Sequence, residues 1–366
     1  MGPAPAVAAV RLALRRTLAD CFGAGPVLVA CSGGADSLAL LAATVFEARK
    51  LSVPVVGVTV DHGLQDGSAD HSAAVVAQME RLGATDTVSV RVQVDPAGEG
   101  IEAAARRERY AALSKVAAEH GSSVVLLGHT RDDQAETVLL GLTRGSGGRS
   151  LAGMPRSLDG LFLRPLLELT RAETEAACRA EGISYWSDPH NTDPRFTRSR
   201  IRHRVLPVLE AELGPGVAAA LARTGEMVRA DVEALDRIAQ QWYDGHRLDS
   251  DAGPPAAGSA TAVGSAGVAG LDSGARSAGR AAGAGSADAT GVALDAGALA
   301  ALDEAIRLRV LRLGALDAGC PSGELFRVHV LGIDELVMAY RGQTRVELPG
   351  HVHASRDGHL LRLARA

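Results

Sequence analysis

A loop of small and polar residues follows an apolar segment near the amino terminus: Ser32, Gly33, Gly34, Ala35, Asp36 and Ser37. The two glycines can adopt backbone angles that other residues avoid, which lets the main chain approach an anion. Backbone N–H groups at the start of the following helix, together with the serine hydroxyls, would donate to phosphate oxygens. The aspartate would repel a bare polyphosphate, so its presence favours a Mg²⁺ ion between its carboxylate and the phosphates. We therefore predict a nucleotide polyphosphate site at this loop.

Two further pairs of polar residues directly follow apolar segments. Asp61 and His62 end one such segment, and Gly128 and His129 end another. In an open α/β sheet, ligands bind at the carboxyl ends of the strands. We therefore expect both pairs to open on the same crevice as the glycine loop and to contact the nucleotide.

Three acidic residues begin the helical pattern that follows His129. Asp132 and Glu136 lie on one helical face. Acids in a first turn also stabilise a helix through its dipole, by about 0.3–1 kcal/mol each, so a capping role is the alternative for Asp132. Asp133 is expected to share a Mg²⁺ ion with Asp36, and a third carboxylate could hold a substrate ammonium group.

Two arginines share one face of the helix predicted to start at Ile101. Arg106 and Arg109 are backed by alanines on that helix. Such arginines are commonly solvated at a surface. If the alanine side packs on the sheet, however, Arg106 or Arg109 would lean over the crevice and stabilise charge on an α-phosphate, because a guanidinium group forks onto phosphate oxygens and stays charged.

The densest basic segment of the chain contains Arg198, Arg200, Arg202 and Arg204. The alternative to a functional role is a solvated helix start. A contact with an RNA backbone is favoured, because the segment lies beyond the predicted nucleotide site, where a large substrate would have to approach.

Alternating strand and helix patterns are expected to position these residues. Strands are predicted at 27–31, 53–60, 87–94 and 123–127, and helices at 36–50, 68–82, 101–120 and 132–143. This alternation predicts a doubly wound, mostly parallel α/β sheet. We expect this Rossmann-like nucleotide-binding domain to occupy residues 1–213.

A smaller, mainly helical domain is expected over residues 214–366. Helical patterns run from about 214–216 to about 246 and from about 292 to 309, and the tail from Phe326 onward is expected to mix helix with short strands. Between them, residues 250–292 are dominated by Ala, Gly and Ser, which predicts a flexible insertion.

Composition narrows the functional class. The 366 residues carry a formal net charge of −5, which argues against indiscriminate coating of nucleic acid. No apolar run approaches the roughly 20 residues of a membrane-spanning helix, so we expect a cytoplasmic protein that makes no membrane contact. The 4 cysteines are scattered without a C-x-x-C pair, which suggests neither a disulfide framework nor a zinc site.

Two common phosphate-binding loops are excluded. A Walker A loop needs a lysine directly after its last glycine, and neither Lys50 nor Lys115 lies near a glycine loop. A dinucleotide-binding loop needs G-x-G-x-x-G after a strand, and the nearest run, residues 145–150, lacks the final glycine.

The remaining pattern, S-G-G-x-D-S, resembles the loop of the PP-loop ATP pyrophosphatases. The whole ordered set of motifs resembles the tRNA(Ile)-lysidine synthetase family within that superfamily. The matching segments are residues 32–37, 61–64, 105–110, 128–137, 144–147, 164–167 and 188–207.

The resemblance implies an ATP-dependent ligase that forms a C–N bond. ATP would adenylate the C2 oxygen of the wobble cytidine in isoleucine tRNA with a CAU anticodon, releasing pyrophosphate. The ε-amine of L-lysine would then displace AMP to form lysidine. Adenylation is needed because an amide-like oxygen is a poor leaving group.

The resemblance also implies roles for individual residues. The glycine loop would hold pyrophosphate, Asp36 and Asp133 would hold Mg²⁺, and Arg106 would contact the α-phosphate. Asp132 or Glu136 would bind the lysine ammonium group, and the four arginines from 198 to 204 would contact tRNA. Whether the enzyme is a homodimer stays open.

Two alternatives remain. A tRNA thiolase on the same ATP-binding domain would need cysteines or an iron–sulfur site to handle sulfur, and the scattered cysteines count against it. A non-catalytic, nucleotide-dependent RNA-binding module is disfavoured by the retention of Asp36, Asp133 and both loop serines.

Overall fold

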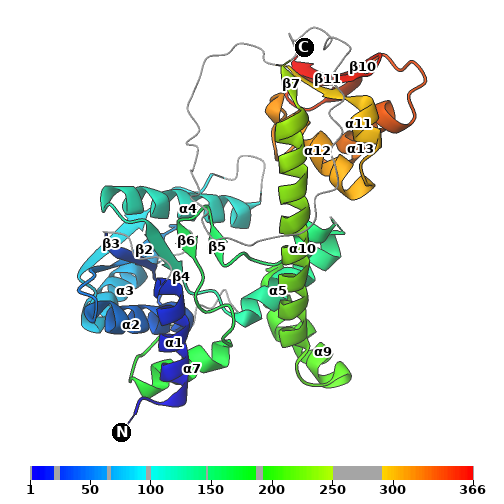
Figure 1. Ribbon diagram of the computed structural model, residues 1–366. Helices are drawn as coiled ribbons and strands as arrows, with labels where there is room; N and C mark the ends of the chain where they lie inside the picture. Colours follow the sequence, from blue (N-terminus) through cyan, green and yellow to red (C-terminus); the bar gives the residue numbers. More distant parts are fainter. Residues whose placement is uncertain are drawn as a thin grey trace, which may run out of the picture. The chain divides into compact units, whose positions relative to one another are not determined.

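The computed structural model describes residues 2–19, 25–63, 67–95, 100–145, 147–186, 193–249 and 291–365 (Figure 1). The chain divides into two compact units, Met1–Val232 and Glu233–Ala366. The division falls within a long helix, later than the 213/214 boundary expected from sequence. The expected insertion at 250–292 lies outside the described residues except for its last two. Residues 188–192 of the 188–207 motif also lie outside them.

A six-stranded sheet forms the first unit. Its strands are β1 (Val27–Ala30), β2 (Val55–Asp61), β3 (Asp86–Arg91), β4 (Val124–Leu127), β5 (Ser157–Leu158) and β6 (Phe162–Leu163). The order is β3-β2-β1-β4-β6-β5, and every neighbouring pair is parallel except β5 with β6. The chain runs outward from β1 to β2 and β3, then returns to place β4 on the other side of β1. This reversal creates a switch point between β1 and β4, where such sheets bind ligands.

Helices cover both faces of this sheet (Figure 1). They are α1 (Pro5–Ala19), α2 (Ala35–Arg49), α3 (Ser68–Leu82) and α7 (Arg171–Ala180) on one face and α4 (Ile101–Glu119) on the other. The unit also contains α5 (Arg131–Arg144) and α6 (Gly148–Leu151). Val27 and Val29 of β1 pack with α1, α2, α3 and α7 in one core cluster, whereas Leu28 packs with α4 in another. Alternate side chains of a strand point to opposite faces. Burial on both faces explains the unbroken apolar runs, and the doubly wound sheet expected from sequence is confirmed.

The first unit continues through α8 (Thr197–Arg200), a π-helical turn (Ile201–Val205) and α9 (Leu206–Leu213) into α10 (Val217–His246). Within the part of the chain that the structure describes, no single helix is long and apolar enough to cross a membrane. One pair, Thr197–Leu213 with Val217–His246, passes that test jointly by length and composition, with a bend of 101° between its members.

The second unit combines an antiparallel sheet with helices. Its elements after α10 are β7 (Leu248–Asp249), β8 (Val292–Asp295), α11 (Ala296–Ala300), α12 (Glu304–Asp317), α13 (Arg327–Met338), β9 (Val346–Leu348), β10 (Val352–Asp357) and β11 (Leu360–Arg365). The sheet order is β7-β8-β11-β10-β9. The expectation of helix from residue 292 is wrong for the first four residues, because β8 pairs with β11 near the end of the chain, a long-range contact that local periodicity does not reveal.

Candidate active site

The glycine loop joins β1 to α2 and is organised by its own serines. The Ser37 hydroxyl donates to the Gly34 carbonyl at 2.9 Å and accepts the backbone N–H of Ser32 at 3.2 Å. The Ser32 hydroxyl oxygen lies 3.4 Å from that of Ser37. Both serines therefore shape the turn, and they stay on the wall of the cavity described below.

Gly33 is required by conformation and by space. Its φ is +83°, and a Cβ atom there would lie 2.8 Å from Val75 Cγ2 and 3.0 Å from His71 Cε1. The Gly33 carbonyl accepts the backbone N–H of Trp186 at 2.9 Å, and His71 Nε2 lies 3.1 Å from the Ser32 carbonyl oxygen. The carbonyls of this loop are thus held by neighbouring elements, which fixes the loop before a nucleotide arrives.

A cavity of about 880 Å³ opens at the carboxyl ends of β1, β2 and β4. This volume is ample for a nucleotide. The structure brings together at its wall nine of the ten residues expected to bind ATP: Ser32, Gly34, Ala35, Asp36, Ser37, Asp61, His62, Gly128 and His129. The tenth, Gly33, turns against His71 and Val75 instead.

Gly128 brings β4 against the glycine loop. A Cβ atom on it would lie 3.0 Å from the Ser37 backbone nitrogen and 3.1 Å from the Asp36 carbonyl oxygen. A side chain at this position would push the two strand ends apart. Close approach of backbone to backbone therefore accounts for this glycine.

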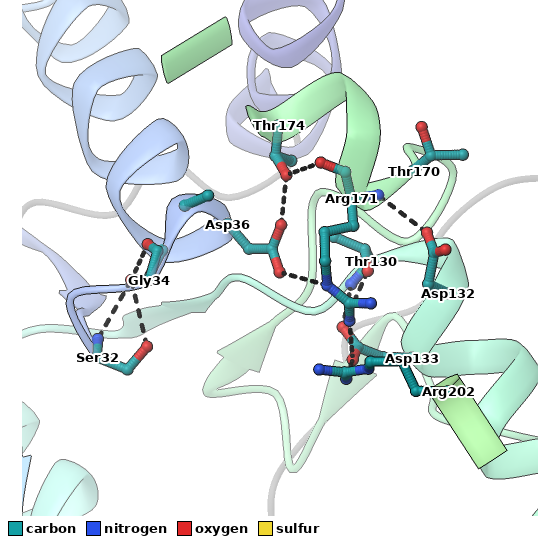
Figure 2. A network of polar contacts seen from close by, with 12 residues as sticks. Ser32, Gly34, Asp36, Thr130, Asp132, Asp133, Thr170, Arg171, Thr174 and Arg202 are labelled. Atoms are coloured by element: carbon teal, nitrogen blue, oxygen red, sulfur yellow. Dashed lines mark hydrogen bonds and ion pairs between the residues drawn. The ribbon is translucent and has the colours of Figure 1, made fainter. Parts of the chain in front are cut away.

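Asp36 lies within the cavity wall, where it has few donors. Thr174 donates a hydrogen bond to its Oδ1, and Arg171 Nε lies 3.6 Å from its Oδ2 (Figure 2). Burial raises the pKa of Asp36 to about 6, despite the opposing effects of Thr174 and Arg171. The carboxylate is therefore under-neutralised, which suits an additional cation.

Arg171 is a site residue that the sequence analysis missed. It begins α7, and its Nη2 lies 3.0 Å from Asp133 Oδ1 and 3.8 Å from Glu136 Oε1. Its backbone N–H donates to Asp132 Oδ2 at 2.9 Å. The available signal was the capping box Thr170–Glu173, which marks a helix start and so places Arg171 in the first turn.

The acidic residues of α5 make ion pairs and hydrogen bonds with Arg171 and with the start of their own helix. Asp133 Oδ2 accepts both the backbone N–H and the hydroxyl of Thr130, at 2.8 and 3.0 Å, which caps the helix. Burial acts to raise the pKa of Asp133, but nearby cations, Arg171 above all, outweigh it and lower that pKa. Asp133 lines the cavity, whereas Asp132 and Glu136 are not part of its wall.

Arg202 forms the second cation of this acidic cluster. Its Nε and Nη2 donate to the two oxygens of Glu136 at 2.7 and 3.1 Å, and Nη2 also lies 3.3 Å from Asp133 Oδ1. Glu136 is fully buried, and burial raises its pKa even though Arg202 opposes the effect. Arg202, expected to contact tRNA, thus points into the protein.

The other three arginines of the basic segment differ in where their side chains lie. Arg198 lines the cavity with Arg202, while Arg200 donates to the carbonyls of Pro194 and Arg195 at 2.7 and 3.0 Å. Arg204 is exposed. The π-helical turn at 201–205 precedes Pro207, whose missing N–H prevents regular α-helical bonding at this point.

The basic side of the cavity comes from α4. Arg109 lines the wall, and burial lowers its pKa. Arg106 is not part of the wall, and its Nη2 donates to the Tyr110 hydroxyl at 3.3 Å. Arg164 also donates to that hydroxyl, at 3.0 Å. The structure therefore places Arg109, rather than Arg106, where it can meet a phosphate.

Two histidines complete the nucleotide side of the cavity. The Nδ1 atoms of His62 and His129 are buried and have no hydrogen-bond partner among the described residues. Burial lowers the pKa of both, that of His129 to about 3, so the rings are neutral at physiological pH. Each ring leaves a polar nitrogen for a ligand to satisfy.

The chain matches a known family model and known proteins along most of its length. A family model described as PP-loop domain matches residues 9–209. The chain is 48% identical over 361 residues to a tRNA(Ile)-lysidine synthase of Thermobifida fusca (strain YX), covering 98% of both chains. It is 45% identical over 386 residues to the tRNA(Ile)-lysidine synthase of Streptomyces coelicolor (strain ATCC BAA-471 / A3(2) / M145), again covering 98% of both.

Among solved structures, the chain is similar to the U34-tRNA thiolase NcsA from Methanococcus maripaludis, which was determined with its [4Fe-4S] cluster. The TM-score is 0.50 at 20% sequence identity, and the match covers 62% of this chain and 80% of that chain. At this identity the likeness concerns the fold alone.

Proposed function

The chain belongs to the tRNA(Ile)-lysidine synthase family of PP-loop proteins, and on this basis we propose that it ligates lysine to C2 of the wobble cytidine in CAU-anticodon isoleucine tRNA. One structural observation supports the proposal most directly. A single cavity joins a phosphate-binding loop to a cluster of carboxylates and arginines at the end of β4. Such a cavity can hold a nucleotide on one side and a cationic amino acid on the other.

The reaction divides into two displacements. In the first, the cytidine O2 attacks the α-phosphorus of ATP, the bond to the β-phosphate oxygen breaks, and pyrophosphate leaves. In the second, the lysine ε-nitrogen attacks C2, the C2–O bond breaks, and AMP leaves with the oxygen. The ammonium group must lose its protons to solvent or to a nearby base.

The residues of the loop and of α4 would act on the nucleotide. Ser32 and Ser37 would hold pyrophosphate, and the free Nδ1 atoms of His62 and His129 would contact the nucleotide. The α-phosphate role expected for Arg106 passes to Arg109, because Arg109 lines the cavity. A charged donor preorganised in a water-poor site stabilises charge that develops in the transition state.

Asp36 and Asp133 provide oxygen ligands of the kind that Mg²⁺ prefers. Mg²⁺ is commonly held by one or two carboxylates together with substrate phosphates. This mode fits the chain, because no group of three His, Cys, Asp or Glu residues suited to a metal occurs among the described residues. When bound, the ion would neutralise charge on the departing pyrophosphate.

The lysine ammonium group would bind on the acidic side of the cavity. Asp133 lines the wall there, and Glu136 shares Arg202 with it. Asp132 would act by holding the start of α7 through the Arg171 backbone. We therefore propose supporting roles for Asp132 and Glu136 around one acidic subsite.

The tRNA would approach from the side of α8 and α9. Arg200 and Arg204 are the members of the basic segment that stay outside the cavity wall, while Arg198 and Arg202 line it. We also propose that residues up to about 213 carry out adenylation and that the rest contribute to tRNA binding. The enzyme is expected to work in the cytoplasm, and its mass in solution would decide whether it forms a homodimer.

A tRNA thiolase is the second candidate, and the thiols of the described residues argue against it. Cys31, Cys178 and Cys320 are buried, and Cys21 lies outside the described residues. Burial raises the pKa of Cys31 and of Cys178 to about 12, which leaves almost no thiolate at physiological pH. Sulfur transfer needs an accessible thiolate or an iron–sulfur ligand set.

The test is incubation of unmodified isoleucine tRNA with ATP, Mg²⁺ and labelled lysine. We expect stable label in the anticodon loop, with one pyrophosphate and one AMP released for each lysine joined. The matched control is the same tRNA with uridine in place of the wobble cytidine, which should stay unlabelled. Modification that depends on a sulfur donor instead of lysine would support the thiolase.

A further inference from the structure

We propose that Arg171 is a displaceable counter-ion of the acidic subsite, occupying the carboxylate oxygens that the cationic ligand takes over when it binds. Its guanidinium group lies between Asp36 and Asp133, which come from different parts of the chain (Figure 2). These are the same two carboxylates that we propose as ligands of the bound cation. The guanidinium group of Arg171 must therefore move away from them when that cation binds.

The contacts of the subsite leave an excess of negative charge. Three carboxylates, those of Asp36, Asp133 and Glu136, face two guanidinium groups, those of Arg171 and Arg202. One negative charge remains uncompensated when all three acids are ionised. A divalent metal ion or a lysine ammonium group would reduce this excess.

The two arginines are held unequally. Arg202 donates to both oxygens of Glu136 at 2.7 and 3.1 Å, which is the strong, two-point form of an arginine–carboxylate pair. Arg171 has one short contact, 3.0 Å to Asp133, and its nitrogens lie 3.6 Å from Asp36 and 3.8 Å from Glu136. Arg171 is therefore the cation that can leave at smaller cost.

The main chain of Arg171 is fixed while its side chain can turn. Its backbone N–H is bonded to Asp132, and its carbonyl oxygen lies 2.8 Å from the Thr174 hydroxyl. The side chain is 22% exposed and lines the cavity, so it has space to move into. Displacement would leave α7 in place and redirect only the guanidinium group, for example toward a phosphate.

The inference predicts the sign of a change in cation affinity. Arg171→Met should bind a cation more tightly than the wild type, because the cation no longer competes with a resident charge. We expect the midpoint of binding to fall about fivefold, the equivalent of about 1 kcal/mol for one partly exposed ion pair. A residue that merely supports the fold would give the opposite result, weaker binding.

Two titrations of the nucleotide-free protein distinguish the ligands. Mn²⁺ is titrated without lysine and followed by the electron paramagnetic resonance signal of the free ion, and lysine is titrated in EDTA by calorimetry. Tighter Mn²⁺ binding identifies the metal as the displacing cation, and tighter lysine binding identifies the ammonium group. Unchanged or weaker binding of both overturns the proposal.

The control variant is Arg345→Met in the second unit, whose guanidinium group forms an exposed ion pair with Glu347. It should bind both cations like the wild type. If Arg171→Met is less stable, the rise in its melting temperature on adding Mn²⁺ or lysine should still exceed that of the wild type, because ligand binding stabilises the folded state by mass action. The inference rests on the proposed function only for the presence of a cationic ligand. Failure to form lysidine would refute that function and leave these titrations interpretable.

Discussion

Thr174 on α7 donates its hydroxyl hydrogen to Asp36 in the glycine loop, 138 residues earlier in the chain. This bond ties the phosphate-binding loop to the helix that carries Arg171, so the two sides of the cavity share one anchor. It does not fully compensate the carboxylate, since burial still raises the pKa of Asp36 to about 6. The ionised carboxylate of Asp36 is therefore only partly compensated by its neighbours.

Asp36→Asn is expected to abolish pyrophosphate release and to stabilise the metal-free protein. The pKa of Asp36 is raised in the folded state, so the folded protein binds a proton more tightly than the unfolded chain, and ionisation costs stability as the pH rises from about 4 to about 6. The amide avoids this cost. The gain should be about 1–3 kcal/mol at pH 8 and should shrink toward pH 4.

Urea unfolding in EDTA at pH 8 and pH 4 measures that gain. Asp70→Asn on α3, an acid in the first turn of an unrelated helix, is the comparison. A variant at Asp36 that is equally stable at both pH values, or less stable at pH 8, would show that the carboxylate is already well compensated.

Gly33→Ala should lose nucleotide binding, because the new methyl group meets Val75 and His71 and the backbone is left-handed at φ +83°. We expect a loss of about 1–2 kcal/mol in stability from the backbone conformation alone. Gly100→Ala, at the start of α4, is the control, since its φ is −65° and an added Cβ atom there would have no neighbour within 4 Å. Equilibrium dialysis with labelled ATP compares the two. Equal ATP affinities would mean that the loop adapts to the substitution.

The sequence predicts the nucleotide side of the site better than the acidic side. Polar residues that directly follow apolar strands, such as Asp61 and His129, must gather at one sheet edge whatever the details of packing. The rotation of α4 about its axis decides which of its arginines reaches the cavity. Arg106 and Arg109 lie on one helical face, so their spacing in the sequence does not show which of them contacts the ligand. The contacts of Arg171 with Asp36 and Asp133 join residues far apart in the chain, so no local pattern carries them.

Arg109→Met should slow adenylation by about a hundredfold, with a much smaller change in the KM for ATP. Removing one preorganised donor from a site of charge development typically costs this much in kcat. Pyrophosphate release with saturating tRNA gives kcat and KM separately. Arg107→Met on the same helix, an exposed residue that contacts Glu108 and the Asp95 carbonyl, should retain the wild-type rate. A large rise in the KM for ATP without loss of kcat would assign Arg109 to ground-state binding instead.

Mutations in the basic segment should distinguish the arginines outside the cavity wall from Arg202, which lines it. Replacing Arg200 and Arg204 with alanine is expected to weaken tRNA binding and to reduce the salt dependence of log Kd by up to about 1.4, from about 0.7 for each phosphate contact on single-stranded RNA. Arg202→Ala should leave that slope unchanged, because its guanidinium group is paired with Glu136 and Asp133 inside the protein and is not free to contact RNA. Filter binding of labelled tRNA between 50 and 200 mM salt, about a fourfold range, gives the slopes. If Arg202→Ala flattened the slope as much as the double variant, the inward contacts of Arg202 would have to open when tRNA binds.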